Sequence, residues 1–428
     1  MARQNPTWYE TPAVQEMLSS LGGKAVRGVM SNYNSAKLLT GKVGLIGLIE
    51  YFDATLDPED RRAIIICDEY TQRFTKKITD LLETIDMEYR IWPKVIPEIP
   101  LPQIDEVVQL CNEFKPKVII AIGGGSVMDA GKITMLKYEK PEENLLLIIP
   151  IGSVGLRKKI KYFVAIPTTS GTGSEVTSAA VFTDTSRDPP KKIEVMCDEF
   201  VPDIAVLDTD FVKDMPPFLT MATGLDALSH SVGSYVSNWG TPYVDAMNIT
   251  AIKEIIKYLP RAYKHGSDLE ARAHMQMAAT MAGLGFGNSI PGIDHSLGHS
   301  FGKVFGVHHG LSVGLFTPYS VDFQSKITDR WVDLCPIFGV EVKGKEKDEL
   351  FKEFMQSLKN FIQSVDGPTC VKELKNPVIN KEEYFDKLDL VADYAFNDAV
   401  SLFSYRTITP EIMRKIFEYA WDGKPIDF

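Results

Sequence analysis

Residues 117–132 read KVIIAIGGGSVMDAGK, and this stretch decides the fold. Its first six residues form a short apolar run rich in β-branched side chains, which is typical of a strand buried on both faces. Three glycines follow at once, and a helix starting there would direct unsatisfied N–H groups and its positive dipole end toward an anion. The stretch therefore predicts a pyrophosphate-binding site. Because it is neither GxGxxG nor GxxxxGK[ST], an ordinary glycine turn is an open alternative.

Three further apolar runs in the first half of the chain resemble residues 117–122. They cover residues 62–68, 162–167 and 204–208, and a segment with helical spacing occupies residues 71–87. Continuous apolar strands that alternate with helices indicate a parallel sheet covered on both faces, which is the α/β class.

The pattern changes after about residue 215, where strand candidates almost vanish and long helical patterns begin. We therefore predict an α/β domain over residues 1–215, with residues 1–35 as an amino-terminal extension, and an all-α domain over residues 216–428. The helical segments of the second domain are expected at 223–236, 243–258, 269–284, 349–365 and 410–419.

The composition is that of an ordinary globular protein and restricts the possible partners. The 428 residues include 46 basic and 57 acidic ones, and the net charge of −11 argues against a nucleic-acid or anionic-membrane surface. The five cysteines are widely spaced without a CxxC pair, which argues against a disulfide framework and for a reducing compartment. Because no signal pattern and no apolar run of about 18 residues occur, the sequence predicts a cytoplasmic protein.

A second loop, rich in hydroxyls, follows the strand predicted at 162–167. Residues 167–177 read PTTSGTGSEVT and lie at an edge of the sheet where α/β proteins bind ligands. Hydroxyls suit phosphate and ribose groups, but they also suit caps and turns. Asp68 ends the strand predicted at 62–68, where a carboxylate could accept both ribose hydroxyls of an adenosine and would repel a 2′-phosphate. This position favours NAD, with NADP the lesser alternative.

The histidines are concentrated in the second half of the chain. Four of the seven lie within fifteen residues, from His295 to His309. Asp226 and His230 are spaced i, i+4, as are His295 and His299, so each pair shares a helix face. A continuous helix would place His309 about 21 Å from His295, so the chain must fold back for both to reach one ion. A lone buried histidine is usually structural, but this pattern predicts an Asp/His₃ metal site.

Four motifs, in this order, resemble those of the iron-containing (group III) alcohol dehydrogenase family. They are GGGSVMDAGK (123–132), PTTSGTGSEVT (167–177), TGLDALSHSVGSYVS (223–237) and GIDHSLGHSFGKVFGVHHG (292–310). The resemblance covers roughly residues 40–428. It implies a Rossmann-like NAD(P)-binding domain, a helical domain that holds one divalent metal, an active site in the cleft between them, and a homodimer or larger homo-oligomer.

The resemblance also implies roles for individual residues. His299 falls where the family keeps a near-metal residue that handles a proton, so it is the expected catalytic residue. The family's metal ligands fall on four residues: Asp226, His230, His295 and His309. The expected cofactor contacts fall on Asp68, Gly124, Gly125, Ser126, Asp129, Thr168, Thr169, Thr172, Lys192 and Leu219.

Three features depart from the family pattern. His308 stands in HHG where the family usually has PHG, so it is an extra imidazole, either solvent-facing or part of a proton relay. Gly233 stands where Glu is common in DALxHxxEAY, and we expect it to open space near the metal. Some thirty-five residues precede the usual start of the family, and a packing or oligomer role is expected for them.

The expected reaction is hydride transfer between a primary alcohol and NAD, with a divalent metal polarising the substrate oxygen. The resemblance favours Fe²⁺, and Zn²⁺ also suits three imidazoles and a carboxylate. A dehydroquinate synthase-like or glycerol dehydrogenase-like zinc enzyme is the alternative within the same superfamily, and a non-catalytic metal- or nucleotide-binding protein is a third. Four aromatic side chains near the motifs favour an apolar substrate pocket, with core packing as the alternative for each: Trp239, Phe286, Phe301 and Phe305.

Overall fold

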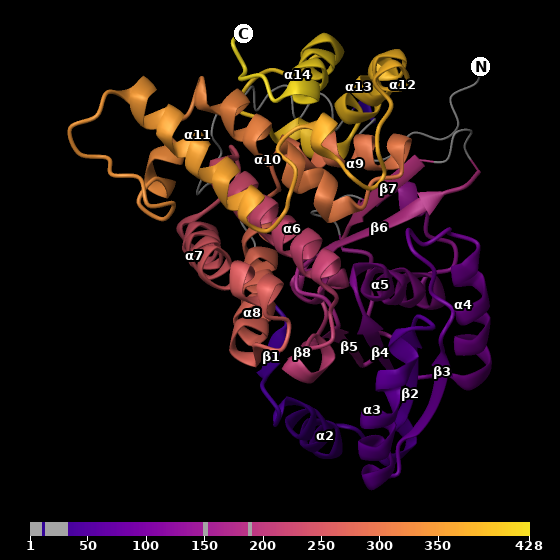
Figure 1. Ribbon diagram of the computed structural model, residues 1–428. Helices are drawn as coiled ribbons and strands as arrows, with labels where there is room; N and C mark the ends of the chain where they lie inside the picture. Colours follow the sequence, from indigo (N-terminus) through magenta and orange to yellow (C-terminus); the bar gives the residue numbers. More distant parts are fainter. Residues whose placement is uncertain (1–10, 13–32, 149–152, 187–190) are drawn as a thin grey trace. The chain divides into compact units, whose positions relative to one another are not determined.

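The computed structural model of the chain (Figure 1) describes residues 11–12, 33–148, 153–186 and 191–428. These residues form two compact units, with residues 33–214 in unit 1 and residues 215–428 in unit 2. Most of the predicted extension, residues 1–35, lies outside the described part of the chain. Among the described helices, none combines the length and apolar character needed to cross a membrane.

Unit 1 is built on a six-stranded sheet in which every neighbouring pair is parallel. The strand order is β1-β8-β5-β4-β2-β3. Apart from their first residues, β2 and β5 are buried, as is all of β4, because their apolar side chains face helices on both sides of the sheet. The strands are β1 (Lys37–Thr40), β2 (Arg62–Cys67), β3 (Glu88–Trp92), β4 (Val118–Gly123), β5 (Tyr162–Pro167) and β8 (Ile204–Leu207).

Alternate residues of the central strands belong to two separate apolar clusters, one on each face. On one face Ile119 and Ala121 pack with α4 (Gln103–Phe114) and α5 (Gly125–Glu139). On the other face Val118, Ile120 and Ile122 pack with α2 (Gly44–Thr55) and α3 (Thr75–Leu82). An antiparallel pair, β6 (Ala179–Asp184) and β7 (Lys191–Met196), completes the unit. The predicted α/β fold with a covered parallel sheet is confirmed.

The strand order contains one topological switch point. The chain runs outward from β2 to β3 and then returns to β4 on the other side of β2, after which it continues outward through β5 and β8. Open α/β sheets bind ligands in the crevice at the carboxyl ends of the strands on either side of such a point. Asp68 directly follows β2 and Gly124 directly follows β4, so both stand at the switch point.

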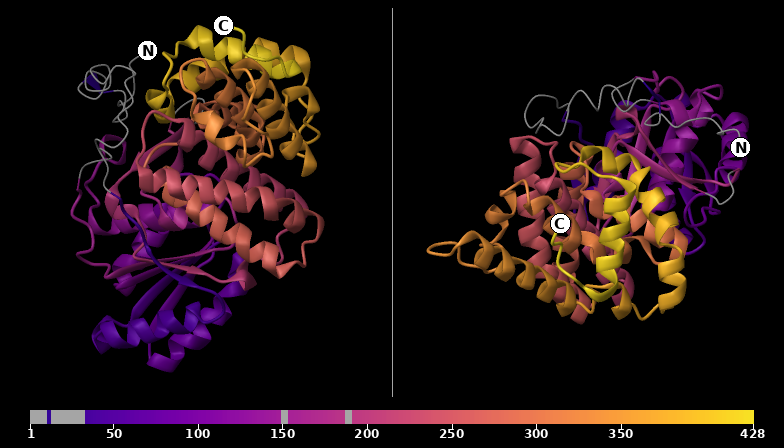
Figure 2. Two further views of the ribbon diagram at one scale, coloured as in Figure 1. Left: turned by 90° about the vertical axis from the view of Figure 1, so that its left-hand side faces the viewer. Right: turned by 90° about the horizontal axis from the view of Figure 1, so that it is seen from above.

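Unit 2 is helical throughout, as predicted. Its long helix α6 is buried from Thr220 to Val236 and packs against α7, α8, α9 and α10. Near the carboxyl terminus α13 packs against α14 (Figure 1 and Figure 2). The helices are α6 (Pro217–Val236), α7 (Pro242–Lys264), α8 (Leu269–Gly287), α9 (Ile293–Phe305), α10 (His309–Ser325), α11 (Lys347–Ser364), α12 (Lys381–Asp386), α13 (Leu388–Phe396) and α14 (Pro410–Asp422).

Candidate functional site

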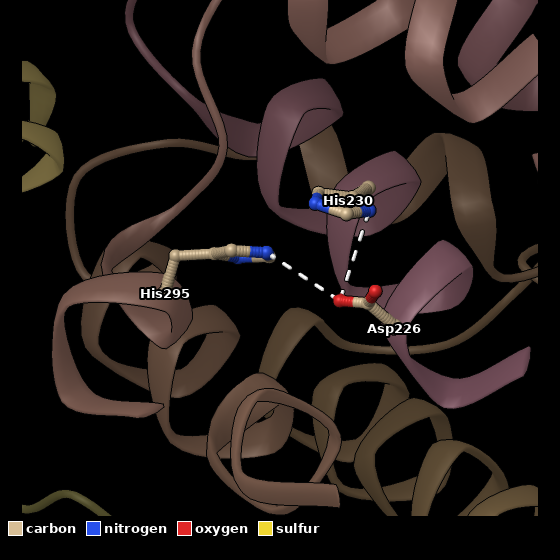
Figure 3. Close-up of side chains that lie close together, drawn as sticks. All are labelled: Asp226, His230 and His295. Atoms are coloured by element: carbon tan, nitrogen blue, oxygen red, sulfur yellow. Dashed lines mark ion pairs between the residues drawn. The ribbon is translucent and has the colours of Figure 1, made fainter. Parts of the chain in front are cut away.

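Three histidines of unit 2 surround one carboxylate oxygen, Asp226 Oδ1. Figure 3 shows Asp226 and His230 on α6 and His295 on α9, with their side chains directed toward one another. The distances to Asp226 Oδ1 are 3.9 Å from His230 Nδ1, 3.8 Å from His295 Nε2 and 3.4 Å from His309 Nε2. These four residues, called the Asp226 cluster below, are the four that sequence reasoning selected as metal ligands.

Three members of the Asp226 cluster fit a divalent metal ion, because ligand atoms of Asp226, His230 and His295 all lie within 4.8 Å of one another. His309 joins them through its 3.4 Å distance to Asp226 Oδ1. Two atoms each about 2.1 Å from one ion at a tetrahedral angle lie about 3.4 Å apart, which is close to the observed spacings. Asp226 Oδ1 and His295 Nε2 are buried, and neither makes a hydrogen bond within the described residues. Burial and the neighbouring imidazoles lower the pKa of His295 well below its usual value, so its ring is neutral, as a metal ligand must be. The donor set is thus one carboxylate oxygen and three imidazole nitrogens, ligand types that divalent metals such as zinc and iron accept.

Glycines bring the three helices close enough to assemble this cluster. Gly306 ends α9 in the left-handed conformation with φ of 67°, and α10 begins only three residues later at His309. A Cβ on Gly310 would lie 2.3 Å from the carbonyl oxygen of Ala222, so only glycine lets the start of α10 lie this close to α6. The chain therefore folds back between His295 and His309, as the spacing requires.

His299 lies beside the Asp226 cluster but has a partner of its own. Its ring centre is 5.7 Å from that of His295 and 5.2 Å from that of His309. His299 Nδ1 is 2.9 Å from Asp398 Oδ2, and Asp398 also accepts a hydrogen bond from the backbone N–H of Val400. Sequence reasoning missed Asp398, because it lies 99 residues from His299 and carries only the signal of a helix cap.

The space expected beside Gly233 is filled, so that expectation is wrong. A Cβ at this position would lie 2.6 Å from the backbone nitrogen of Gly292 and 2.7 Å from Asp294 Oδ2. Asp294 is fully buried, and its Oδ1 lies 2.8 Å from His295 Nδ1, within hydrogen-bond distance. Burial raises the pKa of Asp294 to about 8, although hydrogen bonds from its surroundings oppose this shift. His308 is exposed, and its ring lies edge-on to Phe218 at 5.6 Å.

The two glycine-containing loops of unit 1 lie against each other. The N–H of Thr168 donates to the carbonyl oxygen of Gly123, and a Cβ on Gly125 would lie 2.9 Å from Thr172 Cγ2. Gly124 caps α5 with an extended backbone, so Gly125 and Ser126 are the first residues of a 15-residue helix whose leading N–H groups have no intrahelical acceptor. The hydroxyls of Thr169 and Ser170 are buried without a hydrogen bond in the described part of the chain, as expected of groups that bind a ligand.

A buried ion pair beneath these loops joins them. Lys132 is fully buried, and its Nζ donates to Ser174 Oγ at 2.8 Å, to Thr177 Oγ1 at 3.3 Å and to the carbonyl oxygen of Ala179 at 2.6 Å. Both carboxylate oxygens of Asp129 accept hydrogen bonds, from Ser174 Oγ and from the N–H of Val181. Asp129, an expected cofactor contact, therefore supports the second loop from below. Lys132 was assigned no role in advance.

The three remaining expected cofactor contacts lie on separate elements. Asp68 is half-buried, and its Oδ1 accepts a 2.6 Å hydrogen bond from the N–H of Thr71, the first residue of the short helix Thr71–Phe74. Lys192 lies on β7 and pairs with Glu98 at 3.1 Å. Leu219 lies in the first turn of α6, in unit 2.

The four aromatic residues expected around a substrate pocket divide into two groups. Phe286 stacks on His230 with ring centres 3.9 Å apart, and Trp239 contacts Phe403 edge-on at 5.4 Å. Phe301 is fully buried and, like Phe305, packs in the core of unit 2. Only Phe286 directly contacts the Asp226 cluster among these four.

Comparisons with known proteins cover both units. A family model described as "Iron-containing alcohol dehydrogenase" matches residues 43–209, and one described as "Fe-containing alcohol dehydrogenase family, C-terminal" matches residues 220–421. An NADPH-dependent butanol dehydrogenase of Clostridium saccharobutylicum is 34% identical over 357 residues, which cover 83% of this chain and 89% of that protein.

A second relative and a solved structure agree with these matches. An NAD-dependent methanol dehydrogenase of Bacillus methanolicus is 30% identical over 364 residues, which cover 84% of this chain and 92% of that protein. An alcohol dehydrogenase structure from Oenococcus oeni has a TM-score of 0.83 and 25% sequence identity, with 92% of this chain and 100% of that chain covered.

Proposed function

The chain belongs to the iron-containing alcohol dehydrogenase family, and from this premise we propose that the Asp226 cluster holds the family's divalent metal and that the two loops of unit 1 hold the NAD(P). The protein is an NAD(P)-dependent alcohol dehydrogenase, which in reverse acts as an aldehyde reductase. The observation that carries the proposed site is the convergence of three imidazole nitrogens on one buried carboxylate oxygen.

The proposed metal and cofactor sites would each contribute a different part of the reaction. Bound metal supplies Lewis-acid chemistry, which polarises the substrate oxygen and lowers the pKa of its hydroxyl. Bound NAD⁺ would supply the acceptor for the hydride of the alcohol carbon, and the hydroxyl proton would then have to leave through the protein's own residues. The backbone N–H groups at the start of α5 would hold the pyrophosphate, and the buried hydroxyls of Thr169 and Ser170 would bind the rest of the dinucleotide.

The activity is tested by incubating anaerobically prepared, metal-loaded protein with NAD⁺ and a series of uncharged primary alcohols. We expect net formation of NADH, and we expect aldehydes with NADH to run the reverse reaction. The stacking of Phe286 on His230 favours uncharged, apolar substrates. A dehydroquinate synthase-like enzyme would recycle its NAD and give no net NADH, which would overturn the assignment.

We propose Fe²⁺ as the resident metal. The donor set of one carboxylate and three imidazoles suits Fe²⁺ and also Zn²⁺, and Zn²⁺ binds more tightly in the general order of divalent affinities. Elemental analysis after anaerobic purification, with activity measured after reconstitution by each ion, tests the choice. Higher activity with Zn²⁺ than with Fe²⁺, together with zinc in the purified protein, would contradict it.

We propose NAD as the preferred cofactor, because Asp68 stands at the switch point where an adenosine ribose would lie. Asp68→Ser keeps a side chain able to accept a hydrogen bond from the N–H of Thr71 but removes the charge. Removing repulsion of a 2′-phosphate should be worth about 2 kcal/mol, so the ratio of kcat/KM for NADP⁺ to that for NAD⁺ should rise roughly 30-fold. Glu69→Ser, one residue further on and exposed, is the matched control and should leave this ratio unchanged. An unchanged ratio in both variants would contradict the role of Asp68.

We propose that His299 handles the hydroxyl proton and that Asp398 positions it. By accepting a hydrogen bond from Nδ1–H, Asp398 leaves Nε2 as the basic nitrogen. His299→Ala should lower kcat about 100-fold and Asp398→Asn about tenfold, with metal content unchanged. Asp398→Ala in the His299→Ala background should add no further loss, and Asp393→Asn on α13 should match the wild type. Additive losses would show that Asp398 acts by another route.

The expected homo-oligomer and the expected cytoplasmic location stay predictions. Size-exclusion chromatography with light scattering on the full chain tests the first, and fractionation of the source cells tests the second.

A further inference from the structure

A second buried carboxylate stands behind the Asp226 cluster and has no place among the four proposed ligands. Asp294 lies in the first turn of α9 and is 0% exposed. Its Oδ1 is 2.8 Å from His295 Nδ1, while the other ring nitrogen of His295 lies 3.8 Å from Asp226 Oδ1. The imidazole of His295 is therefore held between two carboxylates, one at each nitrogen.

The shape of the surrounding backbone fits Asp294 closely. A Cβ on Gly233 would lie 2.7 Å from Asp294 Oδ2, and a Cβ on Gly292 would lie 2.9 Å from Gly233 Cα. Helix α6 and the start of α9 thus touch through two glycines, and the carboxylate of Asp294 fills the space that a side chain at position 233 would need. A side chain at position 233 and the carboxylate of Asp294 could therefore not both occupy this space.

A buried carboxylate is costly unless charge or hydrogen bonds compensate it. In the described part of the chain Asp294 Oδ2 makes no hydrogen bond, and Asp294 Oδ1 lies within hydrogen-bond distance of His295 Nδ1. A divalent ion held by Asp226 and three neutral imidazoles would still carry one net positive charge, which Asp294 would balance through the ring of His295. Carboxylates that accept the second N–H of a ligating histidine fix its tautomer and raise its basicity.

We propose that Asp294 is a positioning residue of the metal site: it fixes His295 with Nδ1 protonated and Nε2 directed at the ion, and it packs where position 233 has no side chain. This inference rests on the proposed metal site and gives a role to a residue that lies within the fourth motif but is not among the expected ligands. It predicts that Asp294 controls how tightly the metal is held, while its role in the stability of the metal-free protein is small.

The test measures metal binding directly. Dissociation constants for Co²⁺ and Zn²⁺ are determined by competition with a chelator, and the visible spectrum of the Co²⁺ form reports the ligand geometry. Asp294→Asn should weaken binding 10- to 100-fold and Asp294→Ala at least as much, with an altered Co²⁺ spectrum in both. The thermal midpoint of metal-free Asp294→Asn should stay close to that of the metal-free wild type, because the substitution keeps the volume of the buried side chain.

Asp322→Asn is the matched control, because Asp322 is also buried in unit 2 but pairs with Lys326 and the N–H of Ile426. Its metal affinity should equal that of the wild type. Gly233→Ala should also weaken metal binding, since its Cβ would displace the carboxylate of Asp294. Wild-type affinity in both Asp294 variants overturns the inference, whereas failure of the wild-type protein to bind a metal would overturn the proposed function itself.

Discussion

Replacing His295 with alanine is expected to remove the bound metal and almost all dehydrogenase activity together. His295 is 3% exposed, and its Nε2 is one of three imidazole nitrogens around Asp226 Oδ1. A bound divalent metal lowers the pKa of coordinated water from far above neutral to about 7, and similar help to an alcohol would be worth roughly 10 kcal/mol of alkoxide formation. Loss of even a third of this stabilisation would lower kcat/KM on the order of 10²- to 10³-fold, and loss of the ion should lower it further.

The measurement pairs elemental analysis with kcat/KM for an alcohol and NAD⁺ on the same preparations. His274→Ala is the matched control, because His274 lies on α8 of the same unit, where it pairs with Glu254 and stacks on Tyr258. It should keep its metal and its activity. Circular dichroism should show both variants folded. Full activity in metal-free His295→Ala protein would refute the role of the ion.

The inner strands of the sheet can be predicted from the sequence, whereas its edge strands cannot. Strands β2, β4, β5 and β8 are apolar runs that lie inside the sheet, so burial on both faces leaves a clear pattern. β3 reads EYRIW with Glu88 and Arg90 exposed, and β1 is a four-residue edge strand, so neither has a continuous apolar run. The antiparallel strands β6 and β7, which form a separate two-stranded sheet, were also not predicted from the sequence.

The segment 71–87 shows how local chemistry divides a helix that periodicity suggests. Its apolar spacing predicts one helix, but the structure has α-helix only over Thr75–Leu82, between two short 3₁₀ turns. Asp68 accepts a hydrogen bond from the N–H of Thr71 at the start of the first turn, and Asp86 follows the second turn in the left-handed conformation with φ of 52°. Apolar periodicity indicates which face is buried but not where the hydrogen-bond pattern changes.

The candidate site was predictable where its members are close in sequence. The i, i+4 spacing of Asp226 and His230 places both on one face of α6, and they do converge. The same spacing in His295 and His299 does not mean the same role, because His299 turns to Asp398 on a distant segment. Tertiary packing brings Asp398 to His299 and Lys132 to Ser174. Contacts between residues so far apart in the chain leave no spacing pattern in the sequence.

Lys132→Ala is expected to destabilise unit 1 strongly. Lys132 is fully buried, and its ammonium group joins α5 to the second loop through Ser174, Thr177 and the carbonyl of Ala179. Truncation would also leave Asp129, 3.6 Å away, as a buried charge without its counter-ion. Breaking a buried pair in this way costs roughly 3–5 kcal/mol, whereas an exposed pair is worth less than about 1 kcal/mol. Lys137→Ala, on the same helix and paired with the exposed Asp105, is therefore the control for denaturant unfolding.

A double variant separates the contribution of the Lys132 charge to stability from the contribution of Lys132 to the position of the second loop. Lys132→Met with Asp129→Asn removes both charges at nearly constant volume, so it should recover most of the unfolding free energy that Lys132→Ala loses. It should not recover NAD affinity, because the ammonium contacts to Ser174 and Thr177 remain absent and the loop with the hydroxyls of Thr169 and Ser170 is no longer anchored. Isothermal titration with NAD⁺ measures this directly. Wild-type affinity in the double variant would mean that Lys132 stabilises unit 1 without positioning the loop, whereas a stability loss no larger than that of Lys137→Ala would mean that the buried pair contributes little.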